Sequence, residues 1–98
     1  MSMQSAQGMT AEQRMTLLAQ CFPCHRAILG DEPWNAVKLI RRYGTASTGE
    51  RHVISFLLGV WNMDQDDVPK FNVAEAMMSW DSGHRRAFAA WATAPFCC

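Results

Sequence analysis

The most hydrophobic stretch of the chain, RHVISFLLGVWN at residues 51–62, places the strongest constraint on the fold. Its apolar residues cover more than one face of a helix, so we expect this helix to be enclosed on several sides. Directly before it, Ser47 and Glu50 have the spacing of a capping box, in which each side chain bonds the backbone amide of the other residue. The sequence therefore predicts a central helix over about residues 49–61, around which the other elements pack.

Helix start and stop signals divide the rest of the chain into short helices. The expected helix starts are Thr10 with Gln13 as a second capping box, Asp31, Asn72 with Glu75, and Asp81 or Ser82. The expected stops are Gly30, Gly44 and Pro95. Pro23 should interrupt the first helix, because proline lacks the amide proton and clashes with the carbonyl four residues back.

No segment alternates between apolar and polar residues over a useful length, so strands are not expected. At 98 residues the chain has room for one domain. We predict an all-α fold, a single small domain of four or five short helices packed around the central helix over residues 10–95. Residues 1–9 and 96–98 are predicted to be flexible tails.

The charge balance excludes an attraction of the whole molecule to polyanions. Nine Lys and Arg residues offset nine Asp and Glu residues, which leaves no formal net charge. The first residues lack the pattern of a secretory signal, and no apolar run approaches the ~20 residues that span a bilayer. We therefore expect a cytoplasmic protein with reduced cysteines and no membrane partner.

Cys21, Cys24 and His25 form the string Cys-x-x-Cys-His, which attaches c-type haem and resembles zinc and redox-dithiol motifs. Haem attachment requires export, and a zinc site completed by Cys97 and Cys98 would need adjacent thiols to converge on one ion. A redox pair normally opens a helix, whereas these cysteines close one, where the negative helix pole disfavours a thiolate. We predict no cofactor, with Cys21 packed toward the core by the proline kink, and keep zinc binding as an alternative hypothesis.

No catalytic motif is visible. The sequence has no glycine-rich phosphate loop, no patterned nucleophile and base, and no helical pair of metal-binding histidines. The acidic segment with Asp64, Asp66 and Asp67 lacks the glycine and terminal glutamate of a calcium loop, which favours a solvated turn. We therefore predict a protein that is not an enzyme.

A DNA-binding regulator is a second functional hypothesis. Residues 72–88 have the outline of a helix-turn-helix, with Arg85 and Arg86 near the start of the recognition helix. Two features oppose it, because Trp80 is bulky for the turn and Asp81 would lie near the phosphates.

The stretches TGERHVISFLLGVWN at residues 48–62 and FNVAEAMMSWD at residues 71–81 carry a family resemblance. They resemble a family of small, functionally uncharacterised bacterial proteins, often encoded on plasmids or mobile elements. That family repeats a Thr-Gly-Gln/Glu helix start, a Phe-Leu-Leu core, a Trp-Asn end and a Phe-Asp-Leu segment, from which Asn72 and Val73 depart here. The resemblance implies a helical domain without an assigned activity. It also implies a helix cap and corner formed by Thr48, Gly49, Trp61, Asn62 and Phe71, where we expect Trp61 and Phe71 to pack together.

The abundance of large apolar residues leads to the main functional hypothesis. Four Trp, five Phe and seven Met are more than a core of this size is expected to hide. We predict a non-enzymatic interaction module that binds a protein partner or itself as a homodimer. The predicted interaction surface consists of Trp34, Met77, Met78, Trp80 and Trp91.

Overall fold

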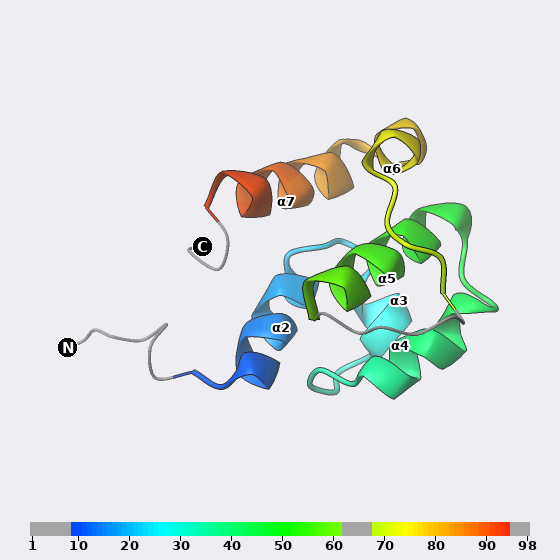
Figure 1. Ribbon diagram of the computed structural model, residues 1–98. Coiled ribbons are helices and arrows are strands. Elements are labelled where there is room, and N and C mark those ends of the chain that lie inside the picture. The colour runs from blue at the N-terminus through cyan, green and yellow to red at the C-terminus, as the bar shows by residue number, and fades with distance from the viewer. Residues whose placement is uncertain (1–8, 62–67, 95–98) are drawn as a thin grey trace.

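The computed structural model describes residues 9–61 and 68–94, and every regular element within them is an α-helix (Figure 1). The helices are α2 (Ala11–Gln20), α3 (His25–Leu29), α4 (Ala36–Tyr43), α5 (Thr48–Trp61), α6 (Val73–Ser79) and α7 (Ser82–Thr93). This confirms the predicted small all-α domain, although the described residues form six helices where four or five are predicted. Most of the predicted tails, the acidic turn at residues 64–67 and the stop at Pro95 lie outside the described residues.

Side-chain caps begin the helices at several of the predicted places. Thr10 and Gln13 exchange hydrogen bonds of 3.1 and 2.9 Å at the start of α2. Ser47 and Glu50 do the same before α5, at 3.3 and 3.0 Å. The Asn72 side chain accepts from the Glu75 amide at the start of α6. These reciprocal bonds satisfy amides that have no partner within the helix.

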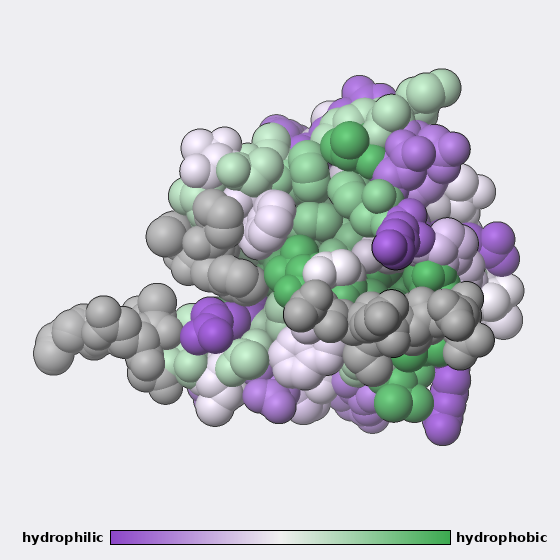
Figure 2. Space-filling model, viewed as in Figure 1, coloured by the Kyte–Doolittle hydropathy of each residue, from purple (hydrophilic) through white to green (hydrophobic). Residues whose placement is uncertain are grey.

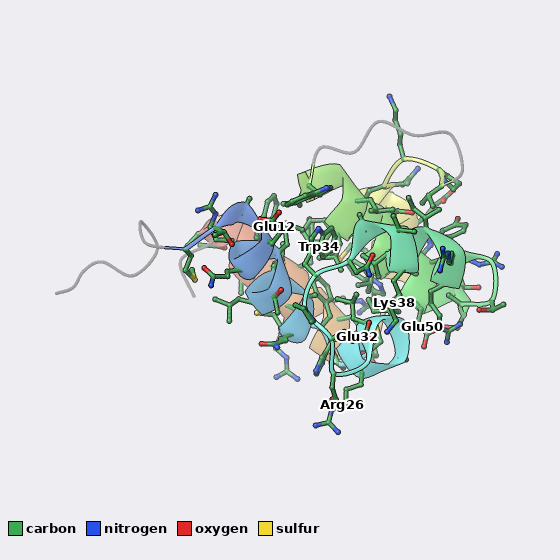
Figure 3. The ribbon with its side chains drawn as sticks, turned by 90° about the horizontal axis from the view of Figure 1, so that it is seen from below. Glu12, Arg26, Glu32, Trp34, Lys38 and Glu50 are labelled. Carbon is green, nitrogen blue, oxygen red and sulfur yellow. The ribbon has the colours of Figure 1, made fainter. Side chains whose placement is uncertain are left out.

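The predicted cap at Asp31 is wrong, and α4 begins five residues later. The Asn35 side chain accepts from the Lys38 amide at 3.0 Å. The Trp34 amide donates to the Thr16 hydroxyl at 2.8 Å, which ties the chain to α2 before α4 can start. Figure 3 shows Trp34 pointing inward among the helices, whereas Arg26 points away from them.

Helical spacing predicts a buried stripe of Trp34, Val37, Ile40 and Tyr43 for this helix, which is also partly wrong. Val37 is 53 % exposed, and Leu39 is the fully buried residue of this helix. Ile40 and Tyr43 are half-buried against the core, as expected. On α6, helical spacing predicts that Val73, Ala76 and Met77 are buried, yet Val73 is 48 % exposed while Ala76 faces the core. Both valines lie on the outer side because their helices start at positions that turn other residues inward.

The interruption at Pro23 is confirmed, but the side chains around it point differently from the prediction. Phe22 is fully buried, four residues after the buried Leu18, and continues the inner face of α2. Cys21 is therefore turned outward, where its thiol donates to the Leu17 carbonyl at 3.4 Å. The inward placement predicted for Cys21 is wrong, because the larger Phe22 occupies that position.

The helix α5 is the centre of the fold, as predicted. Six consecutive residues from Val53 to Leu58 are buried. The helix packs against α2, α4 and α6, which enclose it on several sides. Figure 1 shows α6 and α7 lying across one side of the group formed by α2 to α5. No helix of the described residues is long and apolar enough to cross a membrane.

Aromatic rings fill the space between α5 and α7. Phe56 of α5 lies at the centre, with ring centroids of four other aromatic residues 5.0 to 5.7 Å away. These partners are Phe22, Phe71, Phe88 and Trp91. Tilted and edge-on ring pairs of this kind add stability beyond the area that they bury. The last two helices are therefore held to the rest of the molecule mainly through side-chain rings.

Trp80 lies between α6 and α7. Among the described residues, it makes the one hydrogen bond that crosses this aromatic layer. Its side chain is 3 % exposed, and its indole Nε1–H donates to the Gly49 carbonyl at 3.0 Å, across 31 positions in the sequence. The ring also lies against Phe22, Phe71 and Phe88. One residue thus joins the start of α5 to the junction of α6 and α7.

Substitution of Trp80 by Phe tests how much this hydrogen bond to Gly49 stabilises the fold. The variant keeps an aromatic ring but leaves the Gly49 carbonyl without its donor, so we expect the free energy of unfolding to fall by about 2–3 kcal/mol. Urea denaturation followed by circular dichroism measures the change. Trp91→Phe is the matched control, because the Trp91 indole nitrogen has no hydrogen-bond partner among the described residues. Equal losses in the two variants would show that the Gly49 bond contributes nothing.

Candidate functional site

A pocket of about 300 Å³ lies where the starts of α3, α5 and α7 meet. Its walls come from the residue before α3, from the cap and first turn of α5, and from the junction between α6 and α7. The lining residues are Cys24, Ser47, Gly49, Glu50, Ser79, Trp80, Asp81 and His84. Because helix starts are places where capping side chains gather, the pocket is rich in carboxylate and hydroxyl groups.

Asp81 and His84 form a close pair in this pocket. One carboxylate oxygen, Asp81 Oδ1, accepts from the His84 amide at 3.0 Å and lies 2.8 Å from His84 Nδ1. These hydrogen bonds hold the pKa of Asp81 below its usual value, with the backbone bond as the largest cause. His84 Nε2 is buried and has no hydrogen-bond partner among the described residues.

Aromatic rings fix the position of the His84 side chain. Its ring stacks on Trp80 at a centroid distance of 6.3 Å and lies 6.2 Å from Phe22. The Trp80 ring is in turn fixed by its bond to Gly49. The imidazole is therefore held by a carboxylate at one nitrogen and by apolar faces around the ring.

Glu50 contributes the second carboxylate. Its Oε1 accepts from the Ser47 amide at 3.0 Å and lies 3.4 Å from the Arg42 guanidinium of α4. The side chain is 20 % exposed, so this ion pair is partly shielded from water. Glu50 thus caps α5 and places a negative charge in the pocket wall.

The Cys24 thiol faces this pocket in its protonated form. Burial is the largest cause that raises its pKa to about 12, and the negative charges of Glu50 and Asp81 raise it further. The Arg42 charge and a backbone hydrogen bond act in the opposite direction without outweighing them. Because the thiolate is the nucleophile, Cys24 is not activated at neutral pH.

The structure does not bring the predicted Cys-x-x-Cys-His ligands together. Cys21 is exposed on α2's outer side and Cys24 lines the pocket. His25 Nδ1 lies 3.3 Å from the Phe22 carbonyl, and the residue borders a different hollow, next to Arg26 and Gly30. Within residues 9–61 and 68–94, no group of three or more His, Cys, Asp or Glu residues is arranged to hold a metal ion. Cys97 and Cys98 lie outside that range.

The predicted interaction surface is mostly part of the core. Trp34 is 8 % exposed and Trp80 is 3 % exposed, so their assignment to the surface is wrong. Met77 and Trp91 are half-buried against the core, and Met78 alone is open to solvent, at 83 %. Trp80 and Trp91 lie in the aromatic layer between α5 and α7, and Trp34 packs against Trp61. Figure 2 shows apolar residues gathered in the band between α7 and α5 on this face.

The corner implied by the family resemblance is only partly as expected. Trp61 packs against Trp34, with centroids 5.5 Å apart. Phe71 packs against Phe56 and other rings under α7, so the expected pairing of Trp61 with Phe71 is replaced by two separate contacts. Thr48 and Gly49 form the first turn of α5, as expected, and Asn62 lies outside the described residues.

The two arginines of the DNA-binding hypothesis differ in their surroundings. Arg85 Nε donates to the Met77 carbonyl at 2.9 Å, which links α7 to α6. Arg86 is exposed. The carboxylate of Asp81 lies one turn before Arg85 and is itself largely exposed. DNA binding stays a prediction, with one of its two arginines already bonded within the chain.

Sequence reasoning identified Cys24, Gly49 and Trp80 but missed the pocket that they share. The sequence predicts Asp81 as a helix cap, and helical spacing predicts only that His84 lies on the same face as Ala87, Phe88 and Trp91. The sequence does contain one signal for this pair, the spacing of three positions between Asp81 and His84. This spacing places the side chain of the third helical residue beside the cap. Nothing in the sequence indicated that Glu50 lies near this pair.

Alkylation of Cys21 and Cys24 tests whether each thiol is protonated in the folded protein. With iodoacetamide at pH 8, we expect Cys21 to react at least about tenfold faster than Cys24, because the Cys24 pKa of about 12 leaves almost no thiolate. Peptide mass spectrometry of the folded protein gives both rates. In urea the two rates should become similar, which controls for intrinsic reactivity. Faster alkylation of Cys24 than of Cys21 in the folded protein would contradict this account.

Comparison with known proteins gives no further assignment. The chain matches no protein-family model, no curated protein and no solved structure. The family resemblance of residues 48–62 and 71–81 therefore stays a prediction, and function is argued from the geometry of the pocket.

Proposed function

We propose that this protein is a non-enzymatic binding module that takes up one side chain of a protein partner in the pocket between the starts of α5 and α7. The observation that carries the proposal is the composition of the pocket wall. It joins two carboxylates, two hydroxyls and an imidazole held by Asp81, with a thiol whose pKa is raised to about 12.

Binding agrees with this wall better than catalysis does. The nucleophilic candidate, Cys24, is kept protonated by burial and by the carboxylates of Glu50 and Asp81. An active-site cysteine needs surroundings that stabilise the thiolate. Cys24 is the N-cap of the five-residue α3, so it opens this helix, and the Arg42 charge acts on it, yet burial and the two carboxylates still raise its pKa. The pocket groups are also engaged in helix capping, which gives fixed positions suited to recognition.

The size of the pocket favours a side chain over a free metabolite. A volume of about 300 Å³ is at the lower end for sites that enclose small molecules. Asp81 at the rim is largely exposed, so an occupant would remain open to solvent on that side. A side chain that enters from a partner's surface fits such a pocket, because the partner itself would cover the side that is open to solvent.

The charges favour a protein over a nucleic acid. Glu50 and Asp81 place negative charge at the start of α7, next to the arginines of the DNA-binding hypothesis. A phosphate backbone at this end of α7 would meet that charge, and the chain has no net positive charge to offset it.

A comparison of two variants of α6 tests the proposal. Ser79 lines the pocket, so Ser79→Phe should fill its mouth, whereas Ala74→Phe adds the same ring at an exposed position outside the pocket. Partners captured from the source organism with the wild-type chain are identified by mass spectrometry, and their affinities for the three purified chains are measured. We expect Ser79→Phe to weaken binding at least about tenfold and Ala74→Phe to leave it unchanged. Equal affinities of the Ser79→Phe and wild-type chains would exclude the pocket as the binding site.

A further inference from the structure

The wall of the pocket presents hydrogen-bond acceptors in excess. Glu50 and Asp81 are carboxylates, and the hydroxyls of Ser47 and Ser79 accept as readily as they donate. His84 Nδ1 is already in contact with Asp81 at 2.8 Å, and Nε2 of the same ring is buried, so the acceptors open to an occupant are the carboxylates and hydroxyls. An occupant that brings several N–H donors would satisfy these groups.

Several N–H donors around the pocket are already bonded within the chain. The amides of Ser47 and Glu50 bond each other's side chains in the capping box. The Trp80 amide donates to the Ala76 carbonyl, and its indole donates to Gly49. The His84 amide donates to Asp81. At the starts of α5 and α7, the amide of the third helical residue is therefore occupied by a cap and is not open to an anion.

The charge in the pocket is also of one sign. No Lys or Arg residue is among those that line it. Arg42 contacts Glu50 from α4, but the negative charges of Glu50 and Asp81 still outweigh the Arg42 charge at the Cys24 thiol. An anionic or acceptor-rich occupant would meet repulsion, whereas a cation would be attracted.

We propose that the pocket binds the guanidinium group of an arginine side chain of a protein partner. This inference rests on the proposed function and specifies the chemistry of the occupant. Guanidinium carries five N–H donors spread in a plane, which suits separate acceptors on the walls supplied by α5 and α7. An ammonium group has three donors around one point and reaches fewer acceptors at once.

Small probes test the chemistry without a known partner. The full-length chain, labelled with ¹⁵N, is titrated with methylguanidinium, with methylammonium, and with the neutral isostere methylurea. We expect the amide signals of Glu50, Trp80 and His84 to shift with methylguanidinium, in a saturable way. Methylammonium should bind at least about threefold more weakly, because it makes fewer charge-assisted bonds. Methylurea should cause no saturable shift.

Two conservative variants remove the charges while keeping the caps. Asparagine is as good an N-cap as aspartate, and glutamine completes a capping box as glutamate does, so Asp81→Asn and Glu50→Gln should fold. Each should weaken methylguanidinium binding about three- to tenfold. Glu75→Gln is the control, because it removes the same charge at the third position of α6, away from the pocket.

The outcomes separate this inference from the proposed function. Absence of saturable shifts, equal binding of methylurea, or unchanged affinity in both Asp81→Asn and Glu50→Gln would overturn the arginine assignment. Equal affinity for methylammonium would also overturn it, in favour of any cation. If those results accompanied a partner whose binding is lost in Ser79→Phe, the binding module would stand and its occupant would be of another class.

Discussion

The hydrogen bond from the Trp80 indole to the Gly49 carbonyl is the contact on which the arrangement of the helices depends. It joins the first turn of the central helix to the junction of α6 and α7, across 31 positions. The rest of the attachment of α7 to α5 consists largely of ring contacts around Phe56, which are attractive but less directional than a hydrogen bond. A buried indole N–H without a partner is costly. Trp80 avoids this cost through its bond to Gly49, whereas the buried indole nitrogens of Trp34 and Trp91 have no partner among the described residues.

The pocket follows from the same contact. Gly49 and Trp80 both line it, and their bond brings the capped start of α5 next to the capped start of α7. The carboxylates of Glu50 and Asp81 are placed there first by helix capping, where the positive end of each helix dipole stabilises them. Two helix starts that share one wall therefore place two negative charges around one hollow. The pocket is thus a consequence of helix capping and of one long-range hydrogen bond.

Local signals predicted the helix starts well, and long-range packing explains what they missed. The capping boxes at Thr10 and Ser47 and the caps at Asn72 and Asp81 involve residues three positions apart, so the sequence alone reveals them. The error at Asp31 arose because the amide of Trp34 bonds Thr16, 18 positions away. No local pattern contains that bond.

The sequence predicted single residues of the candidate site but not the pocket that they form, because the pocket also depends on contacts between residues remote in sequence. Cys24 stood out because of its motif, yet its surroundings come from α5 and α7, which are remote in sequence. The tryptophans were assigned to a surface because their number exceeded the core expected for 98 residues. A layer of rings between α5 and α7 enlarges that core and encloses Trp80, which the composition could not indicate.

Hydrogen exchange of the indole protons measures the central contact most directly. In deuterated water, the Nε1 proton of Trp80 is expected to exchange only through global unfolding, so its free energy of exchange should equal that from urea denaturation. The Trp91 indole, which has no hydrogen-bond partner among the described residues, should exchange faster through local opening. Exchange of the Trp80 proton as fast as that of Trp91 would contradict the account, because α6 and α7 would then be held without the Gly49 bond.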